Sequence, residues 1–415
     1  MDNRLSVKKV AYITIVFIYI AYIIFPLFSD TTSIPVYAPS LLVVVASLVM
    51  YPKAFMRVPT LWLIVYVAVL MLYVLLGKPI YINGLDQALS PMSRIIIESA
   101  WILPSITIMN VLLYKNDLQI YRFVGYGSIF LLIISFFYVL PMVMTYSNYL
   151  REDFEALGLS KPPGLPNYTL MHAYTLILLP ICLLLKKTIG KMRYVNVALL
   201  LLFSYMVTKT AVFTSLVVML IIFLFVYLYD VNSKERSVFV LGVVLLMGYV
   251  LYECGVFLLI VDGLMPYFEG TVVISKLEDL RASLIRGEIT GGTITTRMIV
   301  HQQSKDAFWE NPLIGSELVH LGHSKILDLL GSMGLLAFIP YIMILCSSLK
   351  SLIVHVKDRE LKAYLYFSFI IAGVYLYTKG LFGSPGYLFT LVIVPSIIMT
   401  MNKDIALSKR YRRIR

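Results

Sequence analysis

The chain has 415 residues and a formal net charge of +12 at pH 7, with 60% hydrophobic and only 14% charged residues. This balance excludes an ordinary soluble domain, in which about half of the residues are apolar and about a quarter are charged. A bilayer span needs about 20 mostly apolar residues, and runs of this kind fill most of the sequence. We therefore predict an all-α polytopic membrane protein, a single transmembrane domain over residues 1–415 with no separate soluble domain.

A bundle of about twelve transmembrane helices is predicted, which places both termini on the same side of the membrane. The predicted spans cover residues 10–28, 36–51, 59–77, 95–114, 120–144, 168–185, 194–207, 211–229, 237–255, 325–349, 361–378 and 386–401. The span at 194–207 is short, and its separation from the next one depends on Lys209. The first span has no small-residue cleavage site and is long for a signal-peptide core, so we expect it to remain as an anchor.

The distribution of basic residues orients the bundle. With a cytoplasmic N-terminus, 23 of the 35 lysine and arginine residues would lie on cytoplasmic segments, together with seven acidic residues. Cytoplasmic loops carry such an excess of Lys and Arg, so the positive charge reports topology and no nucleic-acid partner is predicted. Residues 256–323, between the ninth and tenth spans, have enough helical pattern and aromatic content to form a long, partly helical extracytoplasmic loop.

Polar residues gather near the end of this loop. Arg297, His301 and Lys305 are spaced four residues apart, so a helix would align three nitrogen-bearing side chains along one face. Pro312 pushes the residue before it out of the helical region, which should end that helix at Asn311. A turn over Pro312–Gly315 should follow.

Two histidines, His320 and His323, precede the tenth span. Ser324 is the predicted N-cap of that helix, and Asp328 falls in its first turn, where the helix dipole favours negative charge. The same dipole should lower the pKa of His323, so its neutral imidazole is a candidate general base. A metal site is another interpretation, but the two histidines lack a third ligand at a suitable spacing, and we predict none. The plain alternative is an interfacial polar residue.

Two lysines lie at predicted outer hairpins. Lys209, in Thr208–Ala211, stands between two apolar runs, where a lysine is costly unless it is paired, lines an aqueous cavity or snorkels to the headgroups. The tight hairpin favours the cavity. Lys379 precedes a Gly/Pro-rich turn, where snorkelling and function fit the sequence equally well. Arg94 and Glu98 begin the fourth span, and their spacing favours a pair that neutralises itself.

Cations and one base at the outer mouth of a membrane bundle suit a lipid-linked diphosphate substrate. Arginine and lysine would stabilise the charge on a leaving lipid diphosphate. The base would take the proton from an acceptor sugar hydroxyl. The residues alone do not select this chemistry over transport of a lipid or a glycan.

Four short motifs follow one another between Pro163 and Leu336. They are Pro163–Asn167 directly before a span, the Thr208–Ala211 hairpin, Arg297 followed by Phe308–Gly315, and His323-Ser324 followed by Asp328 and Gly334–Leu336. Together they resemble the O-antigen ligase/polymerase family of bacterial glycan assembly, with its Gly-x-x-x-Pro-Asn helix start, Ser-Arg-Gly-Ala hairpin, Arg…Phe-x-x-x-Pro-Leu-x-Gly segment and His-Ser or His-Asn helix start. The chain departs from that pattern in its shortened first motif, in Lys209 where arginine is usual, and in Ser316 where a second glycine is common.

The resemblance implies an inverting glycosyltransferase, without metal or cofactor, at the outer face of the bacterial cytoplasmic (inner) membrane. Surrounded by membrane lipid, it would use an undecaprenyl diphosphate-linked oligosaccharide, with a flippase and a chain-length regulator as partner proteins. Arg297 and Lys209 would hold the donor diphosphate with support from Lys379, and His323 would act as base or phosphate ligand. Further substrate contacts are expected from His301, Lys305, His320, Asn167 and Asp328.

The His-Ser helix start resembles the polymerase branch, which extends an O-antigen or capsular glycan on a lipid-linked repeat unit. The ligase branch instead transfers the finished glycan to lipid A–core. A flippase or exporter of lipid-linked oligosaccharide is the hypothesis from another class, and it predicts interior charges on several spans and broken helices near the middle of the membrane. Ionisable residues instead crowd the outer ends of the predicted spans, which favours an enzyme.

Overall fold

The structure is a computed structural model. It describes residues 7–26, 28, 37–78, 80, 90–145, 165, 168–210, 212–229, 256–269, 274, 277–278, 280–282, 293–316, 324–378 and 382–414. Within these ranges, only the backbone is described at residues 213, 256–257, 293–298, 406 and 408–414.

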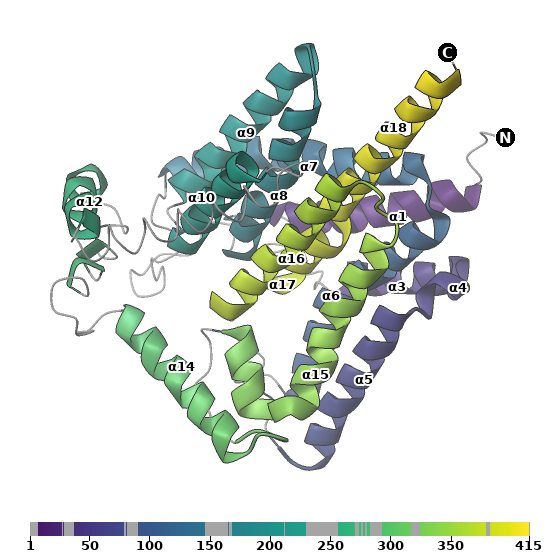
Figure 1. Ribbon diagram of the computed structural model, residues 1–415. Coiled ribbons are helices and arrows are strands. Elements are labelled where there is room, and N and C mark those ends of the chain that lie inside the picture. The colour runs from purple at the N-terminus through teal and green to yellow at the C-terminus, as the bar shows by residue number, and fades with distance from the viewer. Residues whose placement is uncertain are drawn as a thin grey trace.

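Every regular element of the described residues is a helix, and none is a strand. The elements are α1 (Val7–Ile24), α3 (Tyr37–Met50), α4 (Pro52–Phe55), α5 (Val58–Leu75), α6 (Pro91–Lys115), α7 (Leu118–Thr145), α8 (Tyr168–Lys187), α9 (Lys191–Lys209), α10 (Phe213–Leu228), α12 (Val256–Leu264) with the 3₁₀ turn η1 (Met265–Phe268), α14 (Thr293–Glu310), α15 (Lys325–Ile353), α16 (Arg359–Thr378), α17 (Gly383–Leu388), the π-helical η2 (Phe389–Ile393) and α18 (Val394–Ile414). Figure 1 shows α12 apart from the other helices and α5, α14 and α15 projecting from one end of the bundle.

In the described part of the chain, eight helical segments are long and apolar enough to cross a membrane. They are α1, α5, α6, α7, α8, α15, α16 and Gly383–Ile405, which joins α17 to α18. The predicted polytopic membrane fold is confirmed at this level. The predicted spans at 36–51 and 211–229 coincide with the shorter helices α3 and α10, 194–207 coincides with α9, and 237–255 lies outside the described residues. The count of twelve spans therefore stays a prediction.

The outer surface of the bundle is apolar, as a surface in contact with lipid must be. Leu41 of α3 is 63% exposed, and Phe130 and Phe137, two turns apart on one face of α7, are 60% and 62% exposed. Contiguous apolar surface of this extent marks an interaction with a membrane or a partner. The composition and the structure therefore agree on the environment of the bundle.

Helix boundaries follow from local chemistry, as α6 shows. The hydroxyl of Ser90 accepts from the backbone N–H of Ser93 at 3.2 Å, and Pro91 at the first helical position has no N–H to leave unpaired. The helix ends at Lys115. The N–H of the C-cap residue Asn116 makes the last helical hydrogen bond, to the carbonyl of Leu112 at 2.8 Å, and the left-handed φ of 47° at Asn116 then turns the chain away. This turn reverses the chain into α7.

The segment from Gly383 to Ile405 forms the axis of the bundle. It is the most completely buried of the apolar segments, and it packs against α6, α7, α8 and α16. Gly125 of α7 permits a close approach, because a Cβ there would lie 2.9 Å from Cγ1 of Ile397. These four helices are thus arranged around a buried C-terminal segment.

Ion pairs between helices hold one end of the bundle, which we call the basic end. Lys9 of α1 pairs with Asp117 at 2.5 Å, and α7 and α18 are joined by a pair at 2.6 Å between Arg122 and Asp404. Both lysines at the end of α8 pair with Glu360 of α16. Burial would raise the pKa of Asp117, but hydrogen bonds from Lys9 and from backbone N–H groups outweigh it, so this pKa lies below its usual range. Figure 1 shows the start of α1 and the end of α18 on this side of the bundle.

Candidate active site

At the opposite end of α8, five helix ends come together. His172 near the start of α8 lies with Nδ1 3.1 Å from Oγ of Ser215 on α10, and its ring centroid is 4.2 Å from that of Tyr375 on α16. Gly383 at the start of α17 faces Thr169, since a Cβ there would lie 3.0 Å from Cγ2 of that threonine. The starts of α8, α10 and α17 and the ends of α9 and α16 therefore meet, and we call this the site end. His172 is 1% exposed, so it packs in the core.

Three predicted site residues stand at or next to these helix ends in the sequence. α9 ends at Lys209 and α10 begins at Phe213, so the predicted break between these helices is confirmed. The side chain of Lys209 is exposed, with Nζ 5.8 Å from the ring centroid of Tyr205. Asn167, directly before α8, and Lys379, directly after α16, lie outside the described residues. The structure brings the helix ends together, and the contacts of these three side chains with a substrate stay predictions.

The helix predicted to carry three nitrogen-bearing side chains is α14, which ends at Glu310. His301 is half-buried, and its ring centroid lies 5.8 Å from that of Tyr377 near the end of α16. Lys305, one turn further on, is exposed. Arg297 belongs to the first turns of the helix, where only the backbone is described. α14 thus lies beside the site end, and the direction of the Arg297 side chain stays a prediction.

The start of α15 is capped as the sequence predicts. The hydroxyl of Ser324 accepts from the N–H of Leu327 at 3.1 Å. The carboxylate of Asp328 accepts from the N–H of Ser324 at 3.2 Å and from the hydroxyl of Ser304 on α14 at 3.0 Å. The hydrogen bond from Ser304 joins α14 to α15. Asp328 is only 2% exposed, so its burial does not support the predicted contact with substrate. The two residues predicted to act directly before the cap, His320 and His323, lie outside the described residues.

The turn after α14 docks into a break in α15. Gly334, with φ 60° and ψ −164°, divides α15 into two arms. The break deprives the N–H groups of Leu335 and Leu336 of helical acceptors, and they donate instead to the carbonyls of Pro312 at 2.8 Å and Leu313 at 3.0 Å. Backbone groups of an apolar helix need such partners because apolar surroundings offer no acceptor. The turn therefore completes the hydrogen bonding of a membrane helix.

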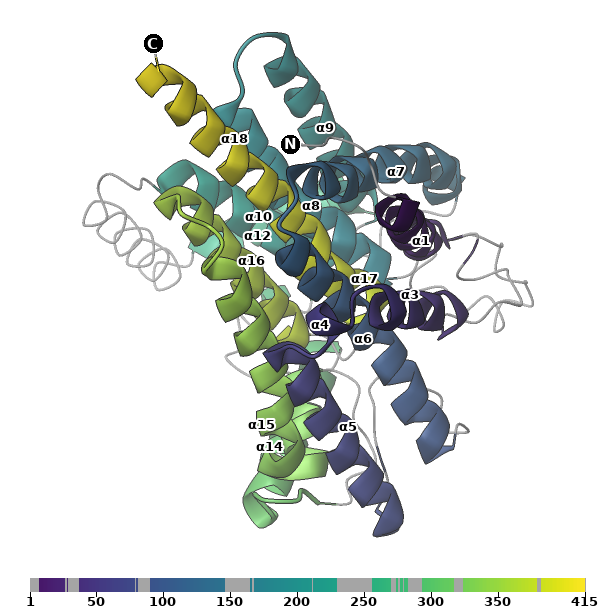
Figure 2. The same ribbon diagram turned by 90° about the vertical axis from the view of Figure 1, so that its right-hand side faces the viewer.

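Two glycines and one tyrosine fix this junction. Gly315 has φ 69°, and a Cβ on Gly315 or Gly334 would lie 2.5 Å or less from backbone atoms of the other segment. The hydroxyl of Tyr73 on α5 donates to the carbonyl of Met333 at 2.6 Å and lies 3.0 Å from the carbonyl of Ile314. Figures 1 and 2 both show α5 alongside α15. A side chain at either glycine would separate the two backbones.

A buried ion pair lies at the start of α15. Nζ of Lys325 is 2.5 Å from Oε1 of Glu98 on α6, and these residues are only 6% and 1% exposed. The hydroxyl of Tyr66 donates to the same carboxylate oxygen at 3.2 Å. Lys325 also lies 5.7 Å from the ring centroid of Tyr341, whose hydroxyl is 2.6 Å from that of Tyr387. Among the described residues, Oε2 of Glu98 has no hydrogen-bond partner.

The expected self-neutralising pair within α6 is replaced by this contact. Glu98 faces α15 and pairs with Lys325, whereas Nη1 of Arg94 donates to the carbonyl of Ile80 at 2.6 Å. Lys325 is a partner that the spacing within α6 does not indicate. A signal was present, because a lysine at the first position of a helix meets the unfavourable end of the dipole. That mismatch indicates a carboxylate partner elsewhere in the bundle.

Across the described residues, no group of three or more His, Cys, Asp or Glu side chains is placed to hold a metal ion. The sequence matches no protein-family model and no curated protein.

Proposed function

We propose that the chain is a polysaccharide polymerase, an inverting, metal-independent glycosyltransferase. It would move a growing O-antigen or capsular glycan from undecaprenyl diphosphate onto a lipid-linked repeat unit at the outer face of the inner membrane. The observation that supports this most is the junction of α14 with α15. Two segments of the family resemblance, Asn311–Gly315 and Gly334–Leu336, are joined there by backbone hydrogen bonds, as expected if both belong to one functional unit.

The arrangement of helix ends gives further support. α14, which carries Arg297, His301 and Lys305, packs on α15 and lies beside the end of α16. The helix ends that border Lys209 and Lys379 meet at the same end of the bundle. If the side chains of Lys209, Arg297 and Lys379 gather at this end, they would suit a diphosphate, which carries negative charge on several oxygens.

In the proposed reaction, the acceptor hydroxyl oxygen attacks the anomeric carbon of the donor sugar. The bond between that carbon and the diphosphate oxygen breaks, and the configuration at the carbon inverts. His323 takes the proton of the acceptor hydroxyl, while Arg297 and Lys209 stabilise the negative charge on the departing undecaprenyl diphosphate. The capped N-terminus of α15, which follows His323 directly in sequence, favours a neutral imidazole there.

Purified protein supplied with lipid-linked repeat units should produce a ladder of longer glycans. His323→Ala should abolish the ladder while the protein still inserts into the membrane. Arg297→Lys should reduce activity although the charge is kept, because a point charge cannot bridge two diphosphate oxygens. Arg193→Lys, on an exposed arginine of α9 at the basic end, is the matched control and should leave activity unchanged. A ladder of wild-type length from His323→Ala would remove this residue from the reaction.

The transport hypothesis gains from two features of the described residues. α15 is broken at Gly334, and the pair of Glu98 and Lys325 is buried inside the bundle. Both features are expected of a carrier of lipid-linked oligosaccharide. Movement of labelled repeat units across vesicle membranes without elongation would favour the carrier. Elongation in detergent, where no second compartment exists, would favour the polymerase, and transfer to lipid A–core alone would favour a ligase.

A further inference from the structure

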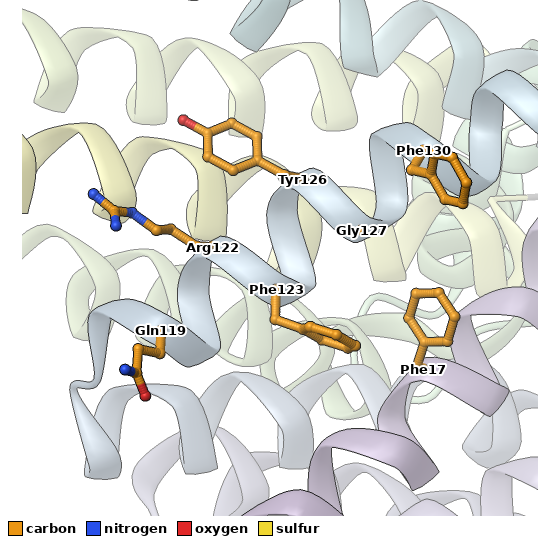
Figure 3. Close-up of a pocket in the computed structure, with 7 residues that line it drawn as sticks. All are labelled: Phe17, Gln119, Arg122, Phe123, Tyr126, Gly127 and Phe130. Carbon is orange, nitrogen blue, oxygen red and sulfur yellow. The ribbon is translucent and has the colours of Figure 1, made fainter. Parts of the chain in front are cut away.

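A groove open to the surroundings runs along α7 near the basic end of the bundle. Its volume is about 590 Å³, and it is lined by Phe17 of α1 and by Gln119, Arg122, Phe123, Tyr126, Gly127 and Phe130 of α7. Figure 3 shows Gln119 and Arg122 toward one end of the groove and Phe17 and Phe130 toward the other. The lining surface is almost entirely apolar. We call the end near the polar groups of Gln119 and Arg122 the head of the groove and the rest its apolar body.

The apolar body has a definite shape because Gly127 carries no side chain. A Cβ at this position would lie 3.2 Å from Cε2 of Phe17. The ring of Phe17 also contacts Phe123, with centroids 5.3 Å apart. Phe123 is 43% exposed and Phe130 60% exposed, so these rings present a ridged apolar surface against which a flexible hydrocarbon chain can pack.

The two basic side chains described at the head of the groove, Lys9 and Arg122, are each paired with a carboxylate, Asp117 and Asp404. Arg122 is half-exposed and pairs with Asp404 of α18. Lys9 lies beside the groove and donates to Oε1 of Gln119 at 3.0 Å. α18 packs against α7 and continues to Ile414 through a strongly basic sequence that contains Lys403, Lys409, Arg410, Arg412 and Arg413. Clusters of this kind next to a membrane span attract anionic lipids.

We propose that this groove binds an anionic phospholipid, with its phosphate at Arg122 and one acyl chain along Phe17, Phe123 and Phe130. The phosphate competes with Asp404 for the Arg122 guanidinium, since both are anions. A zwitterionic lipid also carries a phosphate, but its cationic headgroup is repelled by the basic surroundings. The site is at the opposite end of the bundle from the candidate active site, and it does not depend on the proposed reaction.

The test is lipid retention, measured by native mass spectrometry of protein released from nanodiscs with equal amounts of phosphatidylglycerol and phosphatidylcholine. Wild type should retain phosphatidylglycerol preferentially. Arg122→Gln should lower the apparent affinity for it about fivefold, the effect of one basic residue near a membrane surface. Arg193→Gln removes the same charge from an exposed position on α9 and should change nothing. Gly127→Leu should lower retention by filling the groove while Arg122 stays in place.

Asp404→Asn separates lipid binding from a purely structural role. If Asp404 competes with the phosphate, this variant should raise retention of phosphatidylglycerol. If the ion pair with Arg122 only holds α7 to α18, both variants should lower retention, and the proposal is overturned. Equal retention of the two lipids by wild type, or equal losses in Arg122→Gln and Arg193→Gln, would also overturn it.

Discussion

The buried ion pair between Glu98 and Lys325 makes the sharpest prediction about stability. The two groups lie 2.5 Å apart and are almost completely excluded from solvent. Lys325→Met would leave the carboxylate with one hydrogen bond, from Tyr66 at 3.2 Å. Breaking a buried pair in this way costs about 3–5 kcal/mol, because one charge stays buried without its partner. Glu98→Met should cost a similar amount by isolating the ammonium group.

The double variant, Glu98→Met with Lys325→Met, should cost less than either single change. Replacing both charges by apolar groups removes the desolvation penalty together with the attraction, and such exchanges are often neutral. Equilibrium unfolding in mixed micelles would measure the three variants, with Lys191→Met on an exposed lysine as the control. If the two single losses simply add, to within about 0.5 kcal/mol, the two residues do not interact and the structure is wrong at this point.

Two further predictions concern other parts of the bundle. Gly334→Ala should destabilise the protein by about 3 kcal/mol or more, since it combines a strained φ of 60° with a Cβ 2.5 Å from the backbone of Leu313. The control is Gly373→Ala, which has no atom within 4 Å of the new Cβ and should stabilise α16 by about 0.5–1 kcal/mol. Equal effects of the two variants in thermal denaturation would contradict the close approach of the two backbones at the junction. Folding lowers the pKa of Asp117. The contribution of Asp117 to stability is therefore full above the unfolded carboxyl pKa of about 3.9 and is lost as pH falls through the folded pKa. The difference in melting temperature between wild type and Asp117→Asn should hold from pH 7 to pH 5 and shrink below about pH 4, and a loss of that difference near pH 6 would rule out this titration.

Much of the fold follows from local sequence. Apolar runs longer than a bilayer is thick predict the long helices, and a proline predicts the end of α14. The predicted span at 95–114 falls inside the observed helix Pro91–Lys115. Its earlier start was available from Ser90 and Pro91, a residue pair that favours a cap and a first turn. Such signals act within a few residues, so they need no knowledge of the tertiary structure.

The break in α15 shows what local signals leave out. Residues 325–349 form one apolar run, and a single glycine inside a run of this kind is usually tolerated without a break. Gly334 breaks the helix because carbonyls of Pro312 and Leu313 are available to the freed N–H groups. The same limit applies to Glu98, whose partner belongs to a helix distant in sequence. Spacing within α6 could suggest only Arg94.

The lengths of the two arms of α15 explain why Lys325 is buried. At 1.5 Å per residue, the arm Lys325–Met333 is about 14 Å long, less than half of a hydrocarbon layer of about 30 Å. The arm Leu335–Ile353 is about 28 Å long and can make the crossing alone. Lys325, at the far end of the first arm, lies beside Tyr341, two turns into the second arm. The chain therefore folds back at the break, so that the two arms lie side by side. We infer that α15 is a short re-entrant arm joined to one span. The start of α15 then lies within the bundle, where the buried charge of Lys325 needs the carboxylate of Glu98.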